Sequence, residues 1–210
     1  MALRKSELYR TLWEGADALR GGMDASQYKD YILVLLFLKY VSDKAKVTED
    51  VDLLDVAVPE GYYYDDLLAK MNSEHIGEEM DKALQTILEE NDIEGAFTTF
   101  PRFNNEDLLG KGKEKQATLR KLLILFSKPE LDFSRNRAEG DDLIGDAYEY
   151  LMRKFATQSG KSKGQFYTPA EVSRILAQII GIPHDAPKDT TIYDMACGSG
   201  SLLLKAADHA

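Results

Sequence analysis

The segment from Tyr31 to Leu38 is apolar on nearly every side of a helix, and it constrains the fold more than any other stretch of the chain. Asp24, followed three residues later by Gln27, is typical of the pair that caps the start of a helix. A helix that is apolar all round has to be buried on all its sides, and this run is far shorter than the ~20 residues that cross a membrane. The sequence therefore predicts a helical bundle with this segment at its centre.

Further apolar stripes at helical spacing continue to about residue 155 and predict a mainly α fold. The stripes are Leu8, Leu12, Ala16 and Leu19; Met80, Leu84, Ile87 and Leu88; Leu119, Leu122, Leu123 and Phe126; and Ile144, Ala147, Tyr148, Leu151 and Phe155. A break is expected at Pro59–Tyr64, irregular chain over 95–112, and a helix end at Pro129. No strand is predicted before residue 190.

Composition excludes several classes of protein. Hydrophobic residues make up 44% and charged residues 30%, which is typical of a globular chain with a core. A single cysteine, Cys197, excludes a disulfide scaffold and suits a reducing compartment. The three histidines show no zinc-binding spacing, so no metal is expected. The first residues carry Arg4, Lys5 and Glu7, where a signal peptide would be apolar, so we expect a cytoplasmic protein.

The net charge of −10 comes almost entirely from one segment. Residues 49–94 carry 15 acidic and 2 basic side chains. A solvated acidic face is the interpretation we favour, and a partner-facing surface is the alternative. Two basic stretches are candidate phosphate contacts, although solubilising lysines explain the first of them equally well. The stretches are Lys111, Lys113, Lys115, Arg120 and Lys121, and Arg153, Lys154, Lys161 and Lys163.

The composition of the chain changes near residue 156. Residues 157–164 form a small, polar, basic linker, which predicts a domain boundary between 1–156 and 157–210. A helical stripe follows, made up of Val172, Ile175, Leu176, Ile179 and Ile180. After Pro183 come a short β-rich segment, Thr190–Asp194, a glycine turn and another helix. This order predicts the first strand and helices of a parallel α/β unit.

The first candidate site is the turn Asp194-Met-Ala-Cys-Gly-Ser-Gly200. Glycines let a backbone approach a ligand closely, and the start of a helix favours a negative group. A dinucleotide fingerprint would have glycine in place of Leu203, and a P-loop would have Gly-Lys-Ser/Thr, which is missing. A site for S-adenosylmethionine and a plain strand-to-helix turn both remain open.

The second candidate site is Gly164-Gln-Phe-Tyr-Thr-Pro-Ala-Glu171. Thr168 as the N-cap, Pro169 at the first helical position and Glu171 in a capping box would explain its second half as structure alone. They do not explain Phe166 and Tyr167. A helix from Pro169 to Gly181 runs ~20 Å and a strand returns ~17 Å. Thr168 and Gly198 should therefore meet at the sheet edge where ligands bind.

The sequence "GQFYTPAEV", with "DMACGSGSLL" starting 26 residues after its threonine, resembles the N6-adenine DNA methyltransferases. The segments 23–43 and 143–156 resemble the helical N-terminal domain of the modification subunit of type I restriction–modification systems. The resemblance covers nearly the whole chain, although residues 46–115 resemble the family only in their general character and not in a specific motif. Met195 replaces the usual proline and Ser201 a frequent glycine, but the acid and the two central glycines are kept.

The resemblance implies a Rossmann-like methyltransferase domain that begins within this chain and binds S-adenosylmethionine. It places two sets of residues around the cofactor: Gln165, Phe166, Tyr167, Thr168, Pro169 and Ala170 on one side, and Asp194, Ala196, Gly198, Ser199, Gly200 and Ser201 on the other. The methionine carboxylate and amine would meet Thr168 and the backbone near Gly198. Direct methyl transfer needs no covalent intermediate, so Cys197 is expected to be a packing residue.

The resemblance also implies transfer of a methyl group to the N6 of adenine in duplex DNA. The partners would be a specificity subunit, a second modification subunit and a restriction subunit, with the helical domain clamping the DNA. The family's Asn/Asp-Pro-Pro-aromatic motif holds the flipped base, and this chain has no Pro-Pro pair. We therefore expect the catalytic residues to lie beyond the chain, and the chain to be a fragment that is inactive alone.

Two alternatives remain at this point. A helical interaction module without catalysis would also explain the acidic segment, and a methyltransferase for RNA or protein would share the glycine motif. A lone strand cannot form a stable sheet. We therefore expect residues 185–210 to be poorly ordered, or held against the helical domain or another copy.

Overall fold

The computed structural model describes residues 5–20, 23–47, 56–93, 101–134, 143–158, 168–187, 189–198 and 200–210. The chain forms two units, residues 1–138 and 139–210, and each is described by itself. No helix among the described residues is both long enough and apolar enough to cross a membrane.

The first two helices are α1 (Lys5–Leu19) and α2 (Ala25–Ala45). The capping pair predicted at the start of α2 is confirmed, because Asp24 and Gln27 each donate a backbone N–H to the side-chain oxygen of the other, both at 3.2 Å. The middle of α2 is buried as predicted, with Ile32 and Leu35 wholly inaccessible to solvent.

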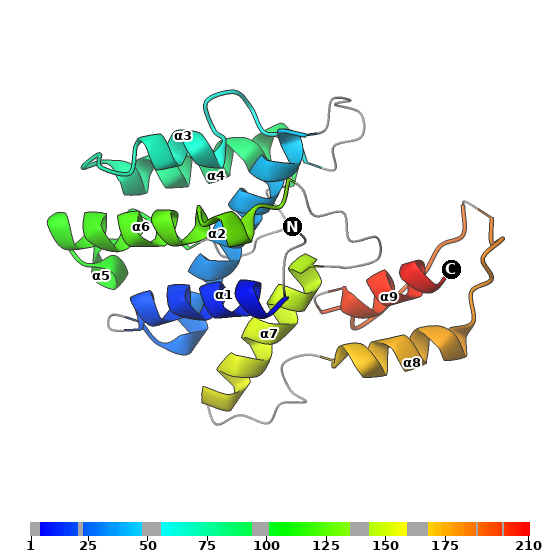
Figure 1. Ribbon diagram of the computed structural model, residues 1–210. Coiled ribbons are helices and arrows are strands. Elements are labelled where there is room, and N and C mark those ends of the chain that lie inside the picture. Colours follow the sequence, from blue (N-terminus) through cyan, green and yellow to red (C-terminus); the bar gives the residue numbers. More distant parts are fainter. Residues whose placement is uncertain are drawn as a thin grey trace. The chain divides into compact units, whose positions relative to one another are not determined.

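The remaining helices of the first unit are α3 (Tyr64–Ala69), α4 (Ile76–Glu90), α5 (Glu106–Leu109), α6 (Lys113–Phe126) and the short 3₁₀ helix η3 (Pro129–Leu131). Helix α6 contacts all five α-helices that precede it. Figure 1 shows it between α1 on one side and α3 and α4 on the other. The three stripes predicted on α1, α4 and α6 are buried, which confirms the helical bundle.

A buried polar network crosses this core. Lys39 Nζ lies 2.6 Å from Asp43 Oδ2, and that same oxygen accepts the backbone N–H of Phe133 at 3.0 Å. Tyr64, which stood in a predicted break, is instead the first residue of α3. Its hydroxyl donates to the Leu123 carbonyl at 3.0 Å, and its N–H donates to Ser42 Oγ at 2.8 Å. These bonds join α3 to α2 and to α6.

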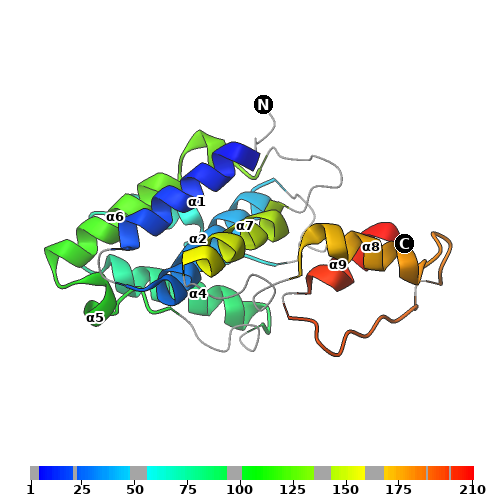
Figure 2. The same ribbon diagram turned by 90° about the horizontal axis from the view of Figure 1, so that it is seen from below.

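The second unit contains α7 (Leu143–Gln158), α8 (Ala170–Ile180) and α9 (Ser201–His209). Helix α7 agrees with the predicted stripe in Ala147, Leu151 and Phe155, which are buried. Helices α8 and α9 pack side by side. His184 Nδ1 lies 2.7 Å from the Ala210 carbonyl oxygen, which brings the ends of the two helices together. Their first residues therefore lie at the opposite, shared end (Figures 1 and 2).

The predicted strand Thr190–Asp194 is wrong as secondary structure. The segment is extended and returns from the end of α8 to the start of α9, but no strand forms among the described residues. A strand is defined by its ladder of hydrogen bonds, and a single one has no partner with which to make them. For residues 185–210 we expect poor order, or packing on the helical domain or on another copy; in the described residues, α9 packs on α8.

The face by which α8 packs is not its apolar stripe. Ser173 and Ala177 are buried in α8, and Ala206 is buried in α9, so the contact between the helices uses small side chains. The predicted stripe is exposed instead, with Ile175 at 55% and Ile179 at 74% of full exposure. Periodicity predicted the helix correctly but does not say which neighbour covers its apolar face.

Candidate functional site

The first predicted corner of the site lies at the start of α8. Pro169 is the N-cap, with φ −57° and ψ 142°, and its carbonyl accepts the N–H groups of Val172 and Ser173 at 2.9 and 3.0 Å. Thr168 and Pro169 are exposed. The capping box of Thr168 and Glu171, which would explain this motif as structure alone, is not observed, because Pro169 is the cap and has no side-chain acceptor. Gln165, Phe166 and Tyr167 lie outside the described residues.

The second predicted corner is the glycine turn before α9. Asp194 Oδ1 accepts the N–H of Ala196 at 2.9 Å, and the N–H of Gly200 donates to the Cys197 carbonyl at 2.7 Å. Gly198 has φ 54° and Gly200 has φ 76°, which is the left-handed region that favours glycine. Ser199, the remaining predicted residue of this turn, lies outside the described residues.

The turn leaves the start of α9 open to a ligand. Gly200 is the N-cap of α9, and no side chain caps the helix there. A Cβ placed on Gly200 would meet nothing within 4 Å, and one placed on Gly198 would meet only the Ala196 carbonyl at 3.8 Å. Backbone N–H groups at an uncapped helix start attract negative groups. The turn therefore has the chemistry to receive a carboxylate or a phosphate.

The packing of α8 on α9 brings these two corners to one end of the pair. Pro169 and Ala170 begin α8, and Gly200 and Ser201 begin α9, at the shared end (Figures 1 and 2). The prediction that Thr168 and Gly198 meet at a sheet edge assumed a strand between the helices. The extended segment after α8 returns the chain to the start of α9 in the same way, although it forms no strand hydrogen bonds among the described residues.

The predicted phosphate contacts are only partly described. Arg153 and Lys154 lie on the exposed side of α7. Lys154 Nζ is 5.7 Å from the centre of the Tyr150 ring, and burial raises the pKa of Tyr150 although Arg153 acts in the opposite direction. Lys161 and Lys163 lie outside the described residues. In the other predicted stretch, residues 111–121, Lys115 is not available to a phosphate, because it is buried and donates to Asn104 Oδ1 at 2.5 Å.

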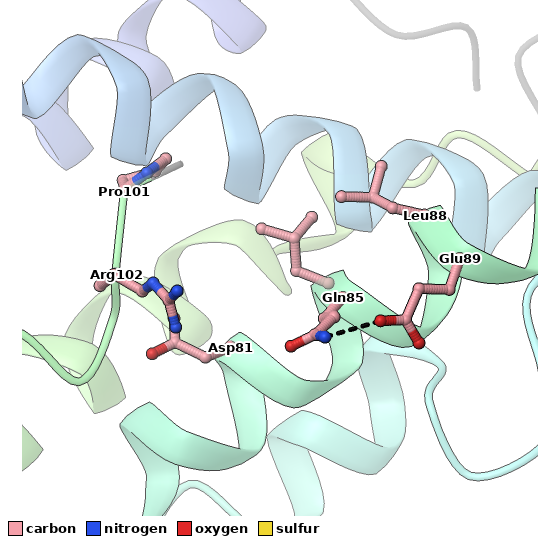
Figure 3. A pocket seen from close by; sticks show the side chains of 7 residues that line it. Asp81, Gln85, Leu88, Glu89, Pro101 and Arg102 are labelled. Carbon is pink, nitrogen blue, oxygen red and sulfur yellow. Dashed lines mark hydrogen bonds between the residues drawn. The ribbon is translucent and has the colours of Figure 1, made fainter. Parts of the chain in front are cut away.

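A separate pocket of about 250 Å³ lies in the first unit, between α4 and the chain that leads to α5 (Figure 3). It is lined by Asp81, Leu84, Gln85, Leu88, Glu89, Pro101 and Arg102. The Asp81 carboxylate accepts the N–H groups of Phe103 and Asn104 at 2.7 and 3.1 Å. Burial raises the pKa of Asp81, although these bonds and Arg102 oppose the rise.

This pocket was not predicted from the sequence. Gln85 and Glu89 occupy ordinary solvent-facing positions of the amphipathic helix α4, and Gln85 Nε2 donates to Glu89 Oε1 at 2.6 Å (Figure 3). Since Asp81 is occupied by two backbone N–H groups, its observed role is to attach the chain at 103–104 to α4. Within the described part of the chain, no group of three or more His, Cys, Asp or Glu side chains is placed to hold a metal.

Two family models match the chain. The model described as the HsdM N-terminal domain matches residues 8–126, and the model described as N-6 DNA Methylase matches residues 139–210. The first match covers the helical bundle. The second covers α7 and both corners of the candidate site.

Relatives and a solved structure agree with these matches. The chain is 28% identical, over 96% of its length, to the type I restriction enzyme MpnII methylase subunit of Mycoplasma pneumoniae, and 31% identical, over 96%, to the MjaVII methylase subunit of Methanocaldococcus jannaschii. It spans 44% and 35% of the length of those proteins. A crystal structure of the type I restriction-modification methyltransferase subunit from Streptococcus thermophilus superposes with a TM-score of 0.75 and 27% identity, covering 98% of this chain and 50% of that one.

Proposed function

The chain belongs to the family of methylase subunits of type I restriction enzymes, and on this premise we propose that it is the N-terminal part of an adenine-N6 DNA methyltransferase. The observation that carries the proposal is the shared end of α8 and α9, where Pro169 caps one helix and the open turn ending at Gly200 leads into the other. Residues 1–156 would then be the helical domain, and residues 157–210 would begin the methyltransferase domain.

The proposed cofactor is S-adenosylmethionine, whose sulfonium supplies an activated methyl group. The residues present fit one side of such a ligand. The uncapped N–H groups at the start of α9 suit the carboxylate of its methionine part, and Gly198 and Gly200 leave room for that group to approach. Thr168, exposed at the shared end, is the proposed partner of the same group.

The remaining residues of the proposed pocket have different roles according to their side chains. Phe166 and Tyr167 would pack on the sulfonium or the adenine of the cofactor, because an aromatic face attracts a cation. Gln165, Pro169 and Ala170 would complete that side, and Asp194, Ala196, Ser199 and Ser201 would complete the other. The observed bond from Ala196 to Asp194 fixes the entry into the glycine turn.

The step at the target base needs groups from outside this chain. A flipped adenine has to be held by acceptors for its amino group and by a stacking aromatic. The chain has no Asn/Asp-Pro-Pro-aromatic sequence. We therefore expect no methyl transfer by the 210 residues alone.

Duplex DNA, a specificity subunit, a second modification subunit and a restriction subunit are the proposed partners. Arg153 and Lys154 on α7, together with Lys161 and Lys163, are proposed to contact phosphates, since Arg153 and Lys154 are exposed cations and phosphate contacts position a protein on its nucleic-acid substrate. Their loss should weaken DNA binding at all sequences and reduce its dependence on salt.

Methylation of DNA tests the proposal directly. The subunit that contains this chain at the length of its relatives is mixed with its specificity subunit, duplex DNA and S-adenosylmethionine, and the digested DNA is examined by mass spectrometry. N6-methyladenine is the expected product. Methylcytosine in its place, or no methylated base, would refute the proposal, and methylation of RNA or protein alone would assign the glycine turn to another substrate.

A further inference from the structure

Met195 is the methionine that is most open to solvent in the part of the chain that the structure describes. It is 87% exposed. Met71 is half-buried, and Met23, Met80 and Met152 are at most 8% exposed. An oxidant reacts first with the sulfur atoms that it can reach, so this difference in exposure singles out Met195 as the thioether that is oxidised first.

The backbone holds Met195 at a defined place in the glycine turn. The Asp194 carboxylate, just before it, accepts the N–H of Ala196, just after it, at 2.9 Å. This bond from a side chain to the backbone two residues on is a local turn that encloses Met195. Because the Met195 side chain is mostly exposed, it adds little to the packing of the second unit. A chemical change at its sulfur therefore acts on what the turn binds and not on a core.

The same turn leads into the open start of α9. Gly200 caps that helix without a side chain, and a Cβ there would meet nothing within 4 Å. The chain between Met195 and Gly200 is bent by the bond from the Gly200 N–H to the Cys197 carbonyl at 2.7 Å. In the proposed function, the carboxylate of the methyl donor enters this turn to reach the free N–H groups. Met195 then lies in the segment that receives the donor.

A peroxide would change the character of this side chain without any further reactant. The sulfur lone pair attacks one oxygen of hydrogen peroxide, and the S–O bond forms as the O–O bond breaks. The hydrogen on the transferred oxygen passes to the departing hydroxide, which leaves as water. Sulfur loses two electrons and the peroxide gains them. The product is a sulfoxide, which is polar where the thioether was apolar and carries a partial negative charge on its oxygen.

We propose that Met195 is an oxidation site, and that its sulfoxide weakens the binding of the methyl donor to the glycine turn. The new oxygen would stand beside the Asp194 carboxylate, in the segment that the carboxylate of the donor has to enter, and like charges repel. As an acceptor, it would also compete with the donor for the free backbone N–H groups. The weakened binding rests on the proposed function, whereas the preference of the oxidant for Met195 does not.

Peptide mapping tests the oxidation site. The 210-residue chain carries Cys197→Ser, which removes the exposed thiol that would also consume peroxide. It is treated with hydrogen peroxide, and mass spectrometry follows the sulfoxide at each methionine over time. Met195 should be oxidised before Met71, and well before the three buried methionines. Oxidation of Met71 first, or of all methionines at one rate, would overturn the proposal.

Donor binding tests the consequence. Calorimetry measures the affinity of the subunit, at the length of its relatives, for S-adenosylmethionine before and after peroxide. Oxidation should weaken binding by at least ~3-fold. Met195→Leu keeps the apolar volume and cannot form a sulfoxide, so it should bind normally and keep its affinity after peroxide. Met195→Gln adds an acceptor oxygen without any oxidant and should weaken binding as oxidation does. Met71→Gln, the matched control in the first unit, should change nothing.

Three results would overturn the proposed effect. They are an unchanged affinity after complete oxidation of Met195, an equal loss in peroxide-treated Met195→Leu, and full affinity in Met195→Gln. The two experiments also separate this proposal from the proposed function. If the unmodified subunit binds no donor, the proposed function fails, while early oxidation of Met195 in the peptide map still supports the modification site.

Discussion

The Asp43 carboxylate accepts the backbone N–H of Phe133 at 3.0 Å, across ninety positions of sequence, while it also holds the ammonium group of Lys39 at 2.6 Å. Both charged side chains are less than one-tenth exposed. One buried carboxylate therefore joins the last turns of α2 to the chain that follows η3.

Removing the lysine of this pair should destabilise the first unit strongly. Lys39→Met leaves the charge of Asp43 buried without its partner, which costs about 3–5 kcal/mol of unfolding free energy. Urea unfolding followed by fluorescence of Trp13, the only tryptophan in the chain, measures this unit. Lys46→Met is the control, since its partner Asp65 is 68% exposed and such pairs contribute about 0–1 kcal/mol. Equal losses in the two variants would contradict the buried network.

Tyr31 should make stability depend on pH in the alkaline range. Its hydroxyl donates to the Arg102 carbonyl at 2.9 Å, and burial, assisted by Asp81, raises the pKa of Tyr31 from 10.0 to about 12. Between these values the unfolded chain loses a proton that the folded chain keeps, so this contribution is complete below pH 10 and disappears as the pH rises through about 12.

Tyr31→Phe should therefore be less stable than the unmodified chain at pH 7, by about 1 kcal/mol for the lost hydrogen bond. The difference should shrink as the pH rises from 10 towards 12. Urea unfolding of both proteins across that range measures it. A gap that stays constant, or widens, would show that the Tyr31 hydroxyl is not held in its neutral form by the fold.

Gly77 should not tolerate alanine, although alanine is the better helix former by about 1 kcal/mol. It lies in α4, and a Cβ there would come within 2.6 Å of the Phe103 backbone oxygen, which cannot move aside cheaply. We expect Gly77→Ala to cost about 1–3 kcal/mol. Gly15→Ala is the comparison, because its nearest neighbour at 2.9 Å is the mobile end of the Ile32 side chain. Thermal unfolding should rank Gly77→Ala well below Gly15→Ala, and the reverse order would contradict this packing.

The exposed stripe of α8 should accept polar residues without loss of stability. Ile175 and Ile179 are 55% and 74% exposed, so Ile175→Gln/Ile179→Gln should change the unfolding free energy by no more than about 0.5 kcal/mol per site. Binding of a dye that reports exposed apolar surface should decrease. A fall of several degrees in Tm would mean that the stripe is covered in solution.

The features that could be predicted best are those that depend only on residues within a single helix. The all-apolar run of α2 can only be buried, and Asp24 with Gln27 can satisfy each other within one turn, so both predictions are confirmed. Lys39 and Asp43 could not be found in this way. Four residues apart on one helix, they resemble an ordinary surface pair, and only the distant Phe133 shows that they are inside.

The same limit explains what failed in the second unit. The helices α8 and α9 and the glycine turn follow from local chemistry, and each formed as predicted. A strand at Thr190–Asp194 and a covered stripe on α8 depend on neighbours that the local sequence does not contain. Of the candidate site, the two helix starts and the glycine turn could be predicted, whereas their position at one end of the helix pair depends on how Ser173, Ala177 and Ala206 pack.

The central claim is that the open turn before α9 receives a methyl donor. Calorimetric binding of S-adenosylmethionine to the subunit at the length of its relatives tests it, with Gly200→Val against Gly61→Val. Both glycines have positive φ and open space around a Cβ, so both variants bear similar strain, but only Gly200 starts α9. We expect donor binding by the unmodified subunit, a loss of at least about tenfold in Gly200→Val and unchanged affinity in Gly61→Val. No binding by the unmodified subunit, or equal affinity in Gly200→Val, would contradict it.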